Sequence, residues 1–297
     1  MAEEQSLGSF GDELKKKLDL SADQWIRASD VLNKFANQIN TTFGQGRQRM
    51  IELNQSIADA VPNVNRLGGQ IEDVASTISQ IAEASRRNVV ASSKDIEQLY
   101  AATKALGMSV GEIESLSNSF LDVGVGIEKI GEELDKSMLY VRSIGGNSKQ
   151  VMEDVRKSMD QMNRFQFEGG VVGLTKMAAQ ASMLRFNMNE TFRLADRVLD
   201  PEGAVETAAA FQRLGVAAGN LADPFQLMNQ SINDPSGLQN SLADVAKQFT
   251  YFDEKTKTFK INPQGVLTLR ELEKQTGASA AEMSKMGLAA AELDKRL

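Results

Sequence analysis

One stretch in the first half of the chain decides the fold: Ile113-Glu-Ser-Leu116-Ser-Asn-Ser-Phe120-Leu-Asp-Val123-Gly-Val-Gly-Ile127-Glu-Lys-Ile130-Gly-Glu-Glu-Leu134. Its apolar residues recur at alternating spacings of three and four, which is the a and d pattern of a heptad repeat. The same frame is found six whole heptads upstream, at Ile71. These positions predict a coiled-coil seam made of Ile71, Val74, Ile78, Ile81, Ile113, Leu116, Phe120, Val123, Ile127, Ile130 and Leu134.

The frame extends from Leu32 to Phe165, where 30 of the 39 a and d positions carry apolar residues, alanine included. A period of 3.5 residues that persists this long favours left-handed supercoiling of long helices. At ~1.5 Å per residue, such a stretch would extend roughly 200 Å. The alternative is a folded bundle of shorter helices that share the frame by accident.

The heptad region also contains interruptions. Ser85, Asn88, Ser92 and Asp95 are consecutive polar a and d positions, and such a layer either fixes register and oligomer state or marks a hinge. Glycines at 68–69, 124, 126, 131 and 145–146 weaken a helix by up to ~1 kcal/mol each relative to alanine. Pro62 lies at an outward position and is expected to begin a new helix after a short break. We therefore expect a segmented rod.

The second half changes character after about Gly169, where the heptad pattern stops. Four of the five prolines follow Asp or Asn, at Pro201, Pro224, Pro235 and Pro263. An Asp or Asn cap followed by proline at the first helical position predicts a helix start. This half is therefore expected to contain short helices of roughly 8–15 residues. Residues 249–261 alternate apolar and polar side chains around a polar turn, which predicts a small β-hairpin.

A short motif recurs three times, at Ser109-Val-Gly-Glu112, Asn187-Met-Asn-Glu190 and Ser279-Ala-Ala-Glu282. Each resembles a capping box, and each follows a candidate helix end. The motif predicts a helix, a tight turn and a capped helix at all three places. The final helix begins near Ala280 and meets no stop signal before Leu297, so we expect the natural chain to continue.

Composition argues against several functional classes. The chain has no histidine and no cysteine, which removes imidazole bases, thiol nucleophiles and the usual zinc ligands. Its net charge of −7 disfavours a broad phosphate-binding surface. We expect no enzyme activity, no catalytic residue, no cofactor, no metal, no signal peptide and no membrane span. The sequence Gly145-Gly-Asn-Ser-Lys149 is better explained as a helix break than as a phosphate loop, and Asp253-Glu254 as a turn rather than a cation site.

From about residue 165 to the end, a series of ordered phrases becomes recognisable. They include Gly173-Leu-Thr-Lys-Met-Ala-Ala-Gln-Ala, Phe192-Arg-Leu-Ala-Asp-Arg-Val-Leu-Asp-Pro-Glu-Gly, Leu221-Ala-Asp-Pro-Phe-Gln-Leu-Met228, Asn233-Asp-Pro-Ser-Gly-Leu-Gln239 and Leu269-Arg-Glu-Leu-Glu-Lys-Gln-Thr-Gly277. This part resembles the tail tape measure proteins of large tailed bacteriophages. No single residue of that family carries a reaction, so the resemblance assigns no site residue.

The resemblance implies a structural virion protein that is assembled in the host cytoplasm and lies inside the tail tube. It would scaffold tube assembly, set tail length and leave ahead of the DNA at ejection. The implied partners are further copies of the chain in a parallel homo-oligomer, tail tube and baseplate proteins, and a tail assembly chaperone. The implied protein binds no specific nucleic acid sequence. Because such proteins are far longer than 297 residues, the chain is expected to be an N-terminal portion.

The sequence thus predicts a mainly α protein, with long segmented coiled-coil helices followed by compact short helices and one hairpin. The expected parts are a flexible N-terminus at 1–20, a heptad rod at 21–168 and a compact domain at 169–297. Two alternatives stay open for the function. One is a signalling coiled coil of the chemoreceptor type, which would need a membrane span and two equal heptad arms, and the other is a different helical scaffold protein.

Overall fold

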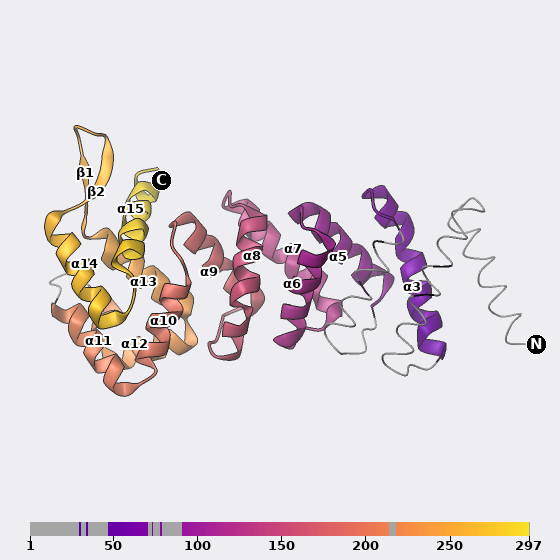
Figure 1. The fold of residues 1–297 in the computed structure, drawn as a ribbon, viewed down its shortest axis with the longest axis horizontal. Helices are drawn as coiled ribbons and strands as arrows, with labels where there is room; N and C mark the ends of the chain where they lie inside the picture. The colour runs from indigo at the N-terminus through magenta and orange to yellow at the C-terminus, as the bar shows by residue number, and fades with distance from the viewer. Residues whose placement is uncertain are drawn as a thin grey trace, which may run out of the picture. The chain divides into compact units, whose positions relative to one another are not determined.

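The computed structural model describes most of the chain (Figure 1). The described residues are 30, 34, 47–70, 73, 78, 91–213 and 218–296. The chain divides into two compact units, Met1–Lys136 and Ser137–Leu297. The predicted flexible N-terminus at 1–20 lies outside the described residues.

The first unit is built from helices, with the bounds α3 (Arg47–Arg66), α5 (Ser93–Leu106), α6 (Val110–Asp122) and the first part of α7 (Ile127–Ser143). Helix α3 packs against α5. A methyl group on Gly131 would lie only 2.6 Å from Cβ of Gln98, so α5 and α7 approach closely at that glycine. Gly131 therefore lies inside a helix and serves packing rather than a break.

The second unit continues with α8 (Ser148–Ser158), the 3₁₀ turn η1 (Met159–Asn163), α9 (Val171–Met183), α10 (Asn189–Val198), α11 (Pro201–Arg213), η2 (Gly219–Ala222), α12 (Pro224–Asn233), α13 (Pro235–Lys247), α14 (Pro263–Thr276) and α15 (Ala280–Arg296). Strands β1 (Thr250–Asp253) and β2 (Thr258–Ile261) form the antiparallel hairpin that was predicted. In Figure 1 the hairpin extends beyond the ends of α14 and α15. The helices cover a core that includes Leu194, Phe211 and Leu272, all with no exposed surface.

The predicted Asp-Pro and Asn-Pro helix starts are confirmed. Helices α11, α12, α13 and α14 each begin at the proline. In each case the preceding Asp or Asn side chain accepts hydrogen bonds from backbone N–H groups of the first turn, as in the 2.9 Å bond from Phe225 N–H to Asp223. These carboxylates and amides satisfy N–H groups that a helix start would otherwise leave unpaired.

Three of the glycines that were expected to weaken helices of the heptad region lie at helix ends. Gly68, Gly124 and Gly145 have positive φ angles of 78°, 84° and 74°. The residue after each glycine donates its N–H to a carbonyl five residues earlier, for example Val125 to Phe120 at 2.9 Å. This is the Schellman end of a helix, in which glycine adopts the left-handed conformation without a steric cost.

Pro62 behaves differently from the expectation. It lies inside α3 rather than at the start of a new helix. Its neighbours Ile57, Val61 and Val64 are buried, whereas Pro62 itself is exposed. Proline within a helix costs about 3 kcal/mol, so we attribute the continuity of α3 to the burial of this apolar face.

The mainly α class and the single hairpin are confirmed for the described residues. Between residues 47 and 158 the described helices are 11 to 20 residues long. The predicted coiled coil along them stays a prediction.

Candidate functional site

Most of the predicted seam residues that the structure describes are buried within the chain. Ile113, Leu116, Phe120, Ile130 and Leu134 have no exposed surface, and Ile78 is 2% exposed. Val123 is half-buried in the turn after α6. Ile71, Val74, Ile81 and the side chain of Ile127 lie outside the described residues. The buried members of the described seam thus form part of the core of the chain itself.

The four polar seam positions divide into two pairs. Ser85 and Asn88 lie outside the described residues. Ser92 and Asp95 form a reciprocal cap at the start of α5: the Ser92 N–H donates to the Asp95 carboxylate at 2.8 Å, and the Asp95 N–H donates to the Ser92 hydroxyl at 3.3 Å. This pair thus caps the start of α5.

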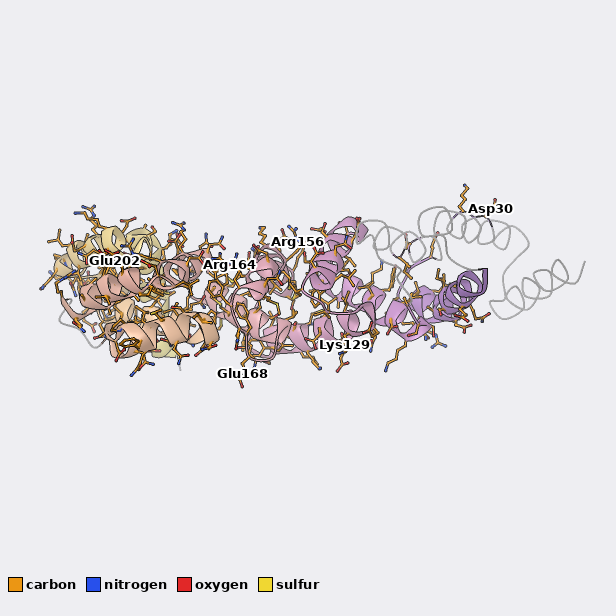
Figure 2. The ribbon with its side chains drawn as sticks, turned by 90° about the horizontal axis from the view of Figure 1, so that it is seen from below. Asp30, Lys129, Arg156, Arg164, Glu168 and Glu202 are labelled. Carbon is orange, nitrogen blue, oxygen red and sulfur yellow. The ribbon has the colours of Figure 1, made fainter. Side chains whose placement is uncertain are left out.

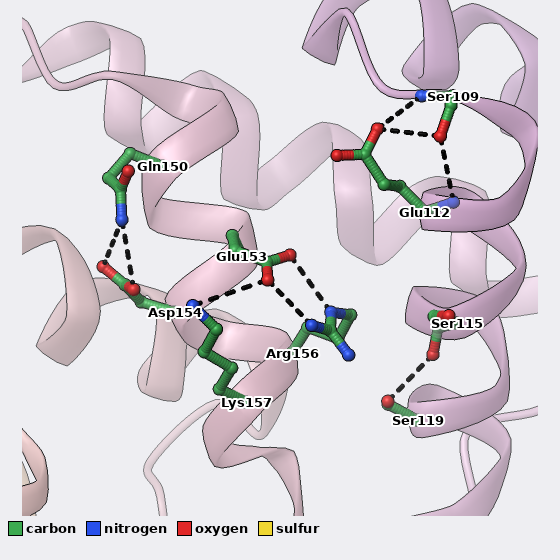
Figure 3. Close-up of polar contacts among 9 residues, drawn as sticks. All are labelled: Ser109, Glu112, Ser115, Ser119, Gln150, Glu153, Asp154, Arg156 and Lys157. Atoms are coloured by element: carbon green, nitrogen blue, oxygen red, sulfur yellow. Dashed lines mark hydrogen bonds and ion pairs between the residues drawn. The ribbon is translucent and has the colours of Figure 1, made fainter.

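The three recurring motifs do form helix–turn–helix corners. In each corner a residue with positive φ ends the first helix, at Gly107 (62°), Arg185 (52°) and Gly277 (74°). A buried residue follows, which is Met108, Phe186 or Ala278. The first residue of the motif comes next. Ser109 and Ser279 directly precede α6 and α15, whereas Asn187 lies two residues before α10 and accepts the Asn189 N–H at 3.0 Å. In the first corner Ser109 and Glu112 cap each other in a complete capping box (Figure 3).

The other two corners exchange their caps. The Glu190 carboxylate of the second corner accepts the N–H of Ser279 in the third corner, at 2.9 Å. Conversely, the Glu282 carboxylate of the third corner accepts the N–H of Asn187 in the second, at 3.2 Å. Glu190 is only 3% exposed, and its second oxygen accepts a bond from Arg193 at 2.7 Å. These crossed caps join α10 and α15 by bonds that the sequence motif alone predicts to be local.

Removing Glu190 is expected to affect an amide far away in the chain. In Glu190→Ala the Ser279 N–H loses its acceptor, which costs about 1–2 kcal/mol. Native-state hydrogen exchange of the Ser279 amide should therefore accelerate by on the order of tenfold. Glu112→Ala is the matched control, because it removes a cap within its own corner and should accelerate exchange of the Ser109 amide only. Unchanged exchange at Ser279 would show that the crossed caps do not form.

A groove of about 490 Å³ lies between α8 and the corner that joins α9 to α10. Asp154 lines it, and burial raises the pKa of its carboxyl above the ordinary value although Gln150 donates a hydrogen bond to it (Figure 3). The other charged side chains that line the groove are the cations Lys157 and Arg185. The groove therefore holds one carboxyl and no second carboxyl to divide acid and base roles with it.

Charged side chains elsewhere are mostly on the outside of the helices. Figure 2 shows Lys129 and Glu168 among them, and both are exposed. On α8, Glu153 accepts two hydrogen bonds from Arg156, which lower the pKa of its carboxyl (Figure 3). Such surface pairs contribute little to stability, with a median of about 0–1 kcal/mol. Within the described residues no group of three or more Asp and Glu side chains is arranged to hold a metal ion.

The hairpin turn is stabilised by its own carboxylate. Asp253 accepts the Lys255 N–H at 2.9 Å and the Lys260 ammonium at 2.5 Å. These contacts, with Lys260 the larger influence, lower the pKa of Asp253 to about 2. The carboxylate is thus occupied by turn and cross-strand bonds, as turn chemistry predicts.

Comparison with known proteins adds no relative. The chain matches no protein-family model, no curated protein and no solved structure. Among the described helices none is long and apolar enough to cross a membrane. Over the described residues the fold is mainly helical, with one two-stranded antiparallel sheet.

Proposed function

We propose that this chain is part of a tail tape measure protein of a large tailed bacteriophage. The observation that carries the proposal is that the heptad frame keeps its phase through the turn at residues 123–126, which separates α6 from α7. Phe120 occupies an a position before the turn at residues 123–126, and Ile127 occupies the next a position after it. A turn that only connected two helices would have no need to keep this phase. The phrases in residues 165–297 that resemble tape measure proteins support the same function.

The frame suggests two forms of the heptad region. In the compact form, residues such as Phe120 and Leu134 are buried within one chain. In the proposed extended form, the helices join end to end and the same residues face parallel copies of the chain. The glycines at 124 and 145 suit such a change, because glycine adopts left-handed and right-handed helical conformations about equally well. Both forms bury the same side chains, which keeps the difference in free energy between them small.

The extended form supplies what a ruler requires. Its length grows by ~1.5 Å for each residue, so the number of residues would set the length of the tail tube. Parallel copies would provide the neighbours on which the tube proteins assemble. Release ahead of the DNA requires passage along a narrow tube, which long segmented helices permit and a wide folded core does not.

Residues 169–297 would serve as a docking part in this proposal. They fold into short, closely packed helices and carry the hairpin, which suits contacts with tail tube proteins, the baseplate or an assembly chaperone. The protein would be assembled in the host cytoplasm and would lie inside the tail of the virion.

An in-frame deletion tests the ruler directly. Removing residues 113–126 from the gene in its phage takes out two whole heptads and keeps the a and d phase. If the extended form sets the length, the tail should become shorter by ~21 Å, because fourteen residues are lost at ~1.5 Å each. The measurement is the mean tail length in electron micrographs of purified virions.

Duplication of the same fourteen residues is the matched control and should lengthen the tail by the same ~21 Å. The two variants alter the compact fold in different ways, so equal and opposite changes would have no other simple cause. Tails of unchanged length in both variants would contradict the proposal that these residues lie in the measured span.

A further inference from the structure

The self-association in the proposed function needs a surface that is accessible when the chain is compact. The described seam residues are, for the most part, buried within the chain and do not offer one. The hairpin does, because within the part of the chain that the structure describes β1 and β2 pair only with each other, and each strand keeps one outer edge. A two-stranded sheet has marginal stability by itself and gains from additional strands.

The register of the hairpin shows which backbone groups point outward. Asn262 donates its N–H to Phe249 at 2.9 Å, so this is a hydrogen-bonded pair at the base of the hairpin. Because antiparallel pairs alternate, Thr250–Ile261 and Phe252–Phe259 are the non-hydrogen-bonded pairs. Their N–H and C=O groups are directed away from the hairpin. These outward groups are the ones that a further strand would bind.

The two faces of the hairpin differ in chemistry. On one face the rings of Phe252 and Phe259 contact each other at a centroid distance of 5.2 Å, and the Lys295 ammonium lies 3.2 Å from the centroid of Phe252. The opposite face carries Tyr251, which is 45% exposed, and the ion pair of Asp253 with Lys260. On this face β1 thus supplies the acidic group and β2 supplies the basic group.

We propose that the hairpin pairs edge to edge with the hairpin of a second copy, so that β2 of one copy runs antiparallel to β1 of the next. This names the self-association surface of the proposed function and rests on that function for its parallel arrangement of copies. If neighbouring copies are not shifted along the strand direction, the residues that pair within one hairpin also pair between neighbouring hairpins. Phe259 then lies beside Phe252 of the neighbour, and Lys260 lies between two Asp253 carboxylates.

The charges on the hairpin favour β2–β1 contact between copies over β1–β1 or β2–β2 contact. A β1–β1 contact would bring two Asp253 carboxylates near each other, and a β2–β2 contact would do the same for two Lys260 ammonium groups. Like charges across neighbouring strands are destabilising. Rotation of copies about an axis parallel to the strands places β2 beside β1 of the next copy, which is a head-to-tail contact of the kind found in rings.

Cysteine cross-linking tests the pairing cleanly because the chain has no cysteine. Thr250→Cys and Ile261→Cys are made separately in the full 297-residue chain, purified and mixed under mild oxidation. In the proposed register Thr250 of one copy lies opposite Ile261 of the next, with Cα atoms about 5.5 Å apart, which suits a disulfide. Mass spectrometry should show on the order of tenfold more mixed dimer than either same-variant dimer.

The controls separate this result from random collision. Thr268→Cys, a half-buried position on α14, should give no excess of mixed dimer when it is combined with Ile261→Cys. Equal amounts of mixed and same-variant dimers, or an excess of the Thr250→Cys dimer, would overturn the head-to-tail pairing.

A second measurement does not depend on cysteines. Self-association of the chain, followed by sedimentation, should be lost in Ile261→Pro, which removes an outward N–H, and kept in Ile261→Val. Association that survives in Ile261→Pro would also overturn the proposal. The two proposals can fail separately. Cross-links together with tails of unchanged length would reject the proposed function and support the hairpin contact. Shortened tails without cross-links would support the proposed function and reject the hairpin contact.

Discussion

Replacing Phe120 by alanine is expected to lower the free energy of unfolding of the first unit by about 3–5 kcal/mol. Phe120 lies on α6 and has no exposed surface, and it is among the largest fully buried side chains of the described residues. Its removal loses the transfer free energy of the ring and leaves a cavity that neighbouring helices fill only in part. Native-state hydrogen exchange of the α6 amides is the measurement, because it reports the unit that contains the substitution.

The dependence on protein concentration is the decisive part of this prediction. If Phe120 is buried within one chain, the loss should be the same over a hundredfold range of concentration. If it were buried only between copies, dilution would unfold the unsubstituted protein as well, because association then contributes to stability. Leu139→Ala is the control for loss of an exposed side chain: Leu139 is 67% exposed in the part of α7 that belongs to the second unit, and its removal should change the free energy of unfolding of that unit by less than about 0.5 kcal/mol.

Replacing Gly287 by valine is expected to destabilise the second unit by about 3 kcal/mol. Gly287 lies on α15 where this helix crosses α13, and these two helices share an extensive contact. A Cβ atom at Gly287 would lie 2.6 Å from the carbonyl oxygen of Ala246 and 2.8 Å from its carbonyl carbon. Because both atoms belong to the backbone, the two helices would have to move apart to accept the side chain.

Gly111→Val is the matched control for this substitution. Gly111 also lies in a helix, α6, but apart from its chain neighbours and the backbone of its own helix no atom lies within 4 Å of the position that its Cβ would take. The same change of residue should therefore alter the free energy of unfolding by less than about 0.5 kcal/mol. The measurement is urea unfolding followed by hydrogen exchange, of the α13 and α15 amides for Gly287→Val and of the α6 amides for Gly111→Val, because the two glycines lie in different units. Equal effects at the two glycines would mean that α13 and α15 are not in close contact at Gly287.

The hairpin and the proline helix starts could be predicted because their causes lie within a few residues. An Asp or Asn before proline caps the turn that follows it, whatever the rest of the chain does. The alternation of residues 249–261 likewise fixes which side chains share a face of the hairpin. In the same way the glycines at 68, 124 and 145 indicated breaks that the structure places at helix ends.

One expectation in the heptad region was wrong for a physical reason, and for one pair of residues the structure shows a role that the pattern had left open. Pro62 was expected to start a helix, but burial of the surrounding apolar face keeps α3 continuous through it. Ser92 and Asp95 were interpreted as a seam layer or a hinge, and they cap α5. Their spacing of three residues fits both a heptad position pair and a capping box, so the pattern alone could not distinguish the two.

The crossed caps show the limit of local reasoning most clearly. The motifs at Asn187–Glu190 and Ser279–Glu282 predict that each glutamate bonds within its own corner. In the structure Glu190 bonds an amide 89 positions away and Glu282 one 95 positions away. Which N–H a glutamate reaches depends on how the corners pack, and no spacing within either motif encodes that packing.

By itself the sequence determined the capped helix starts, the helix ends at glycine, the hairpin turn and which residues are apolar on one face. These features follow from dihedral preferences and from hydrogen bonds between residues three or four apart. Only the tertiary structure decided what the apolar face meets, because burial is non-directional and a heptad seam is satisfied equally by its own chain or by another copy. The sequence likewise could not show that Gly287 lies where two helices cross, or that no described strand pairs with the outer edges of the hairpin. Both features depend on elements that are distant in the sequence.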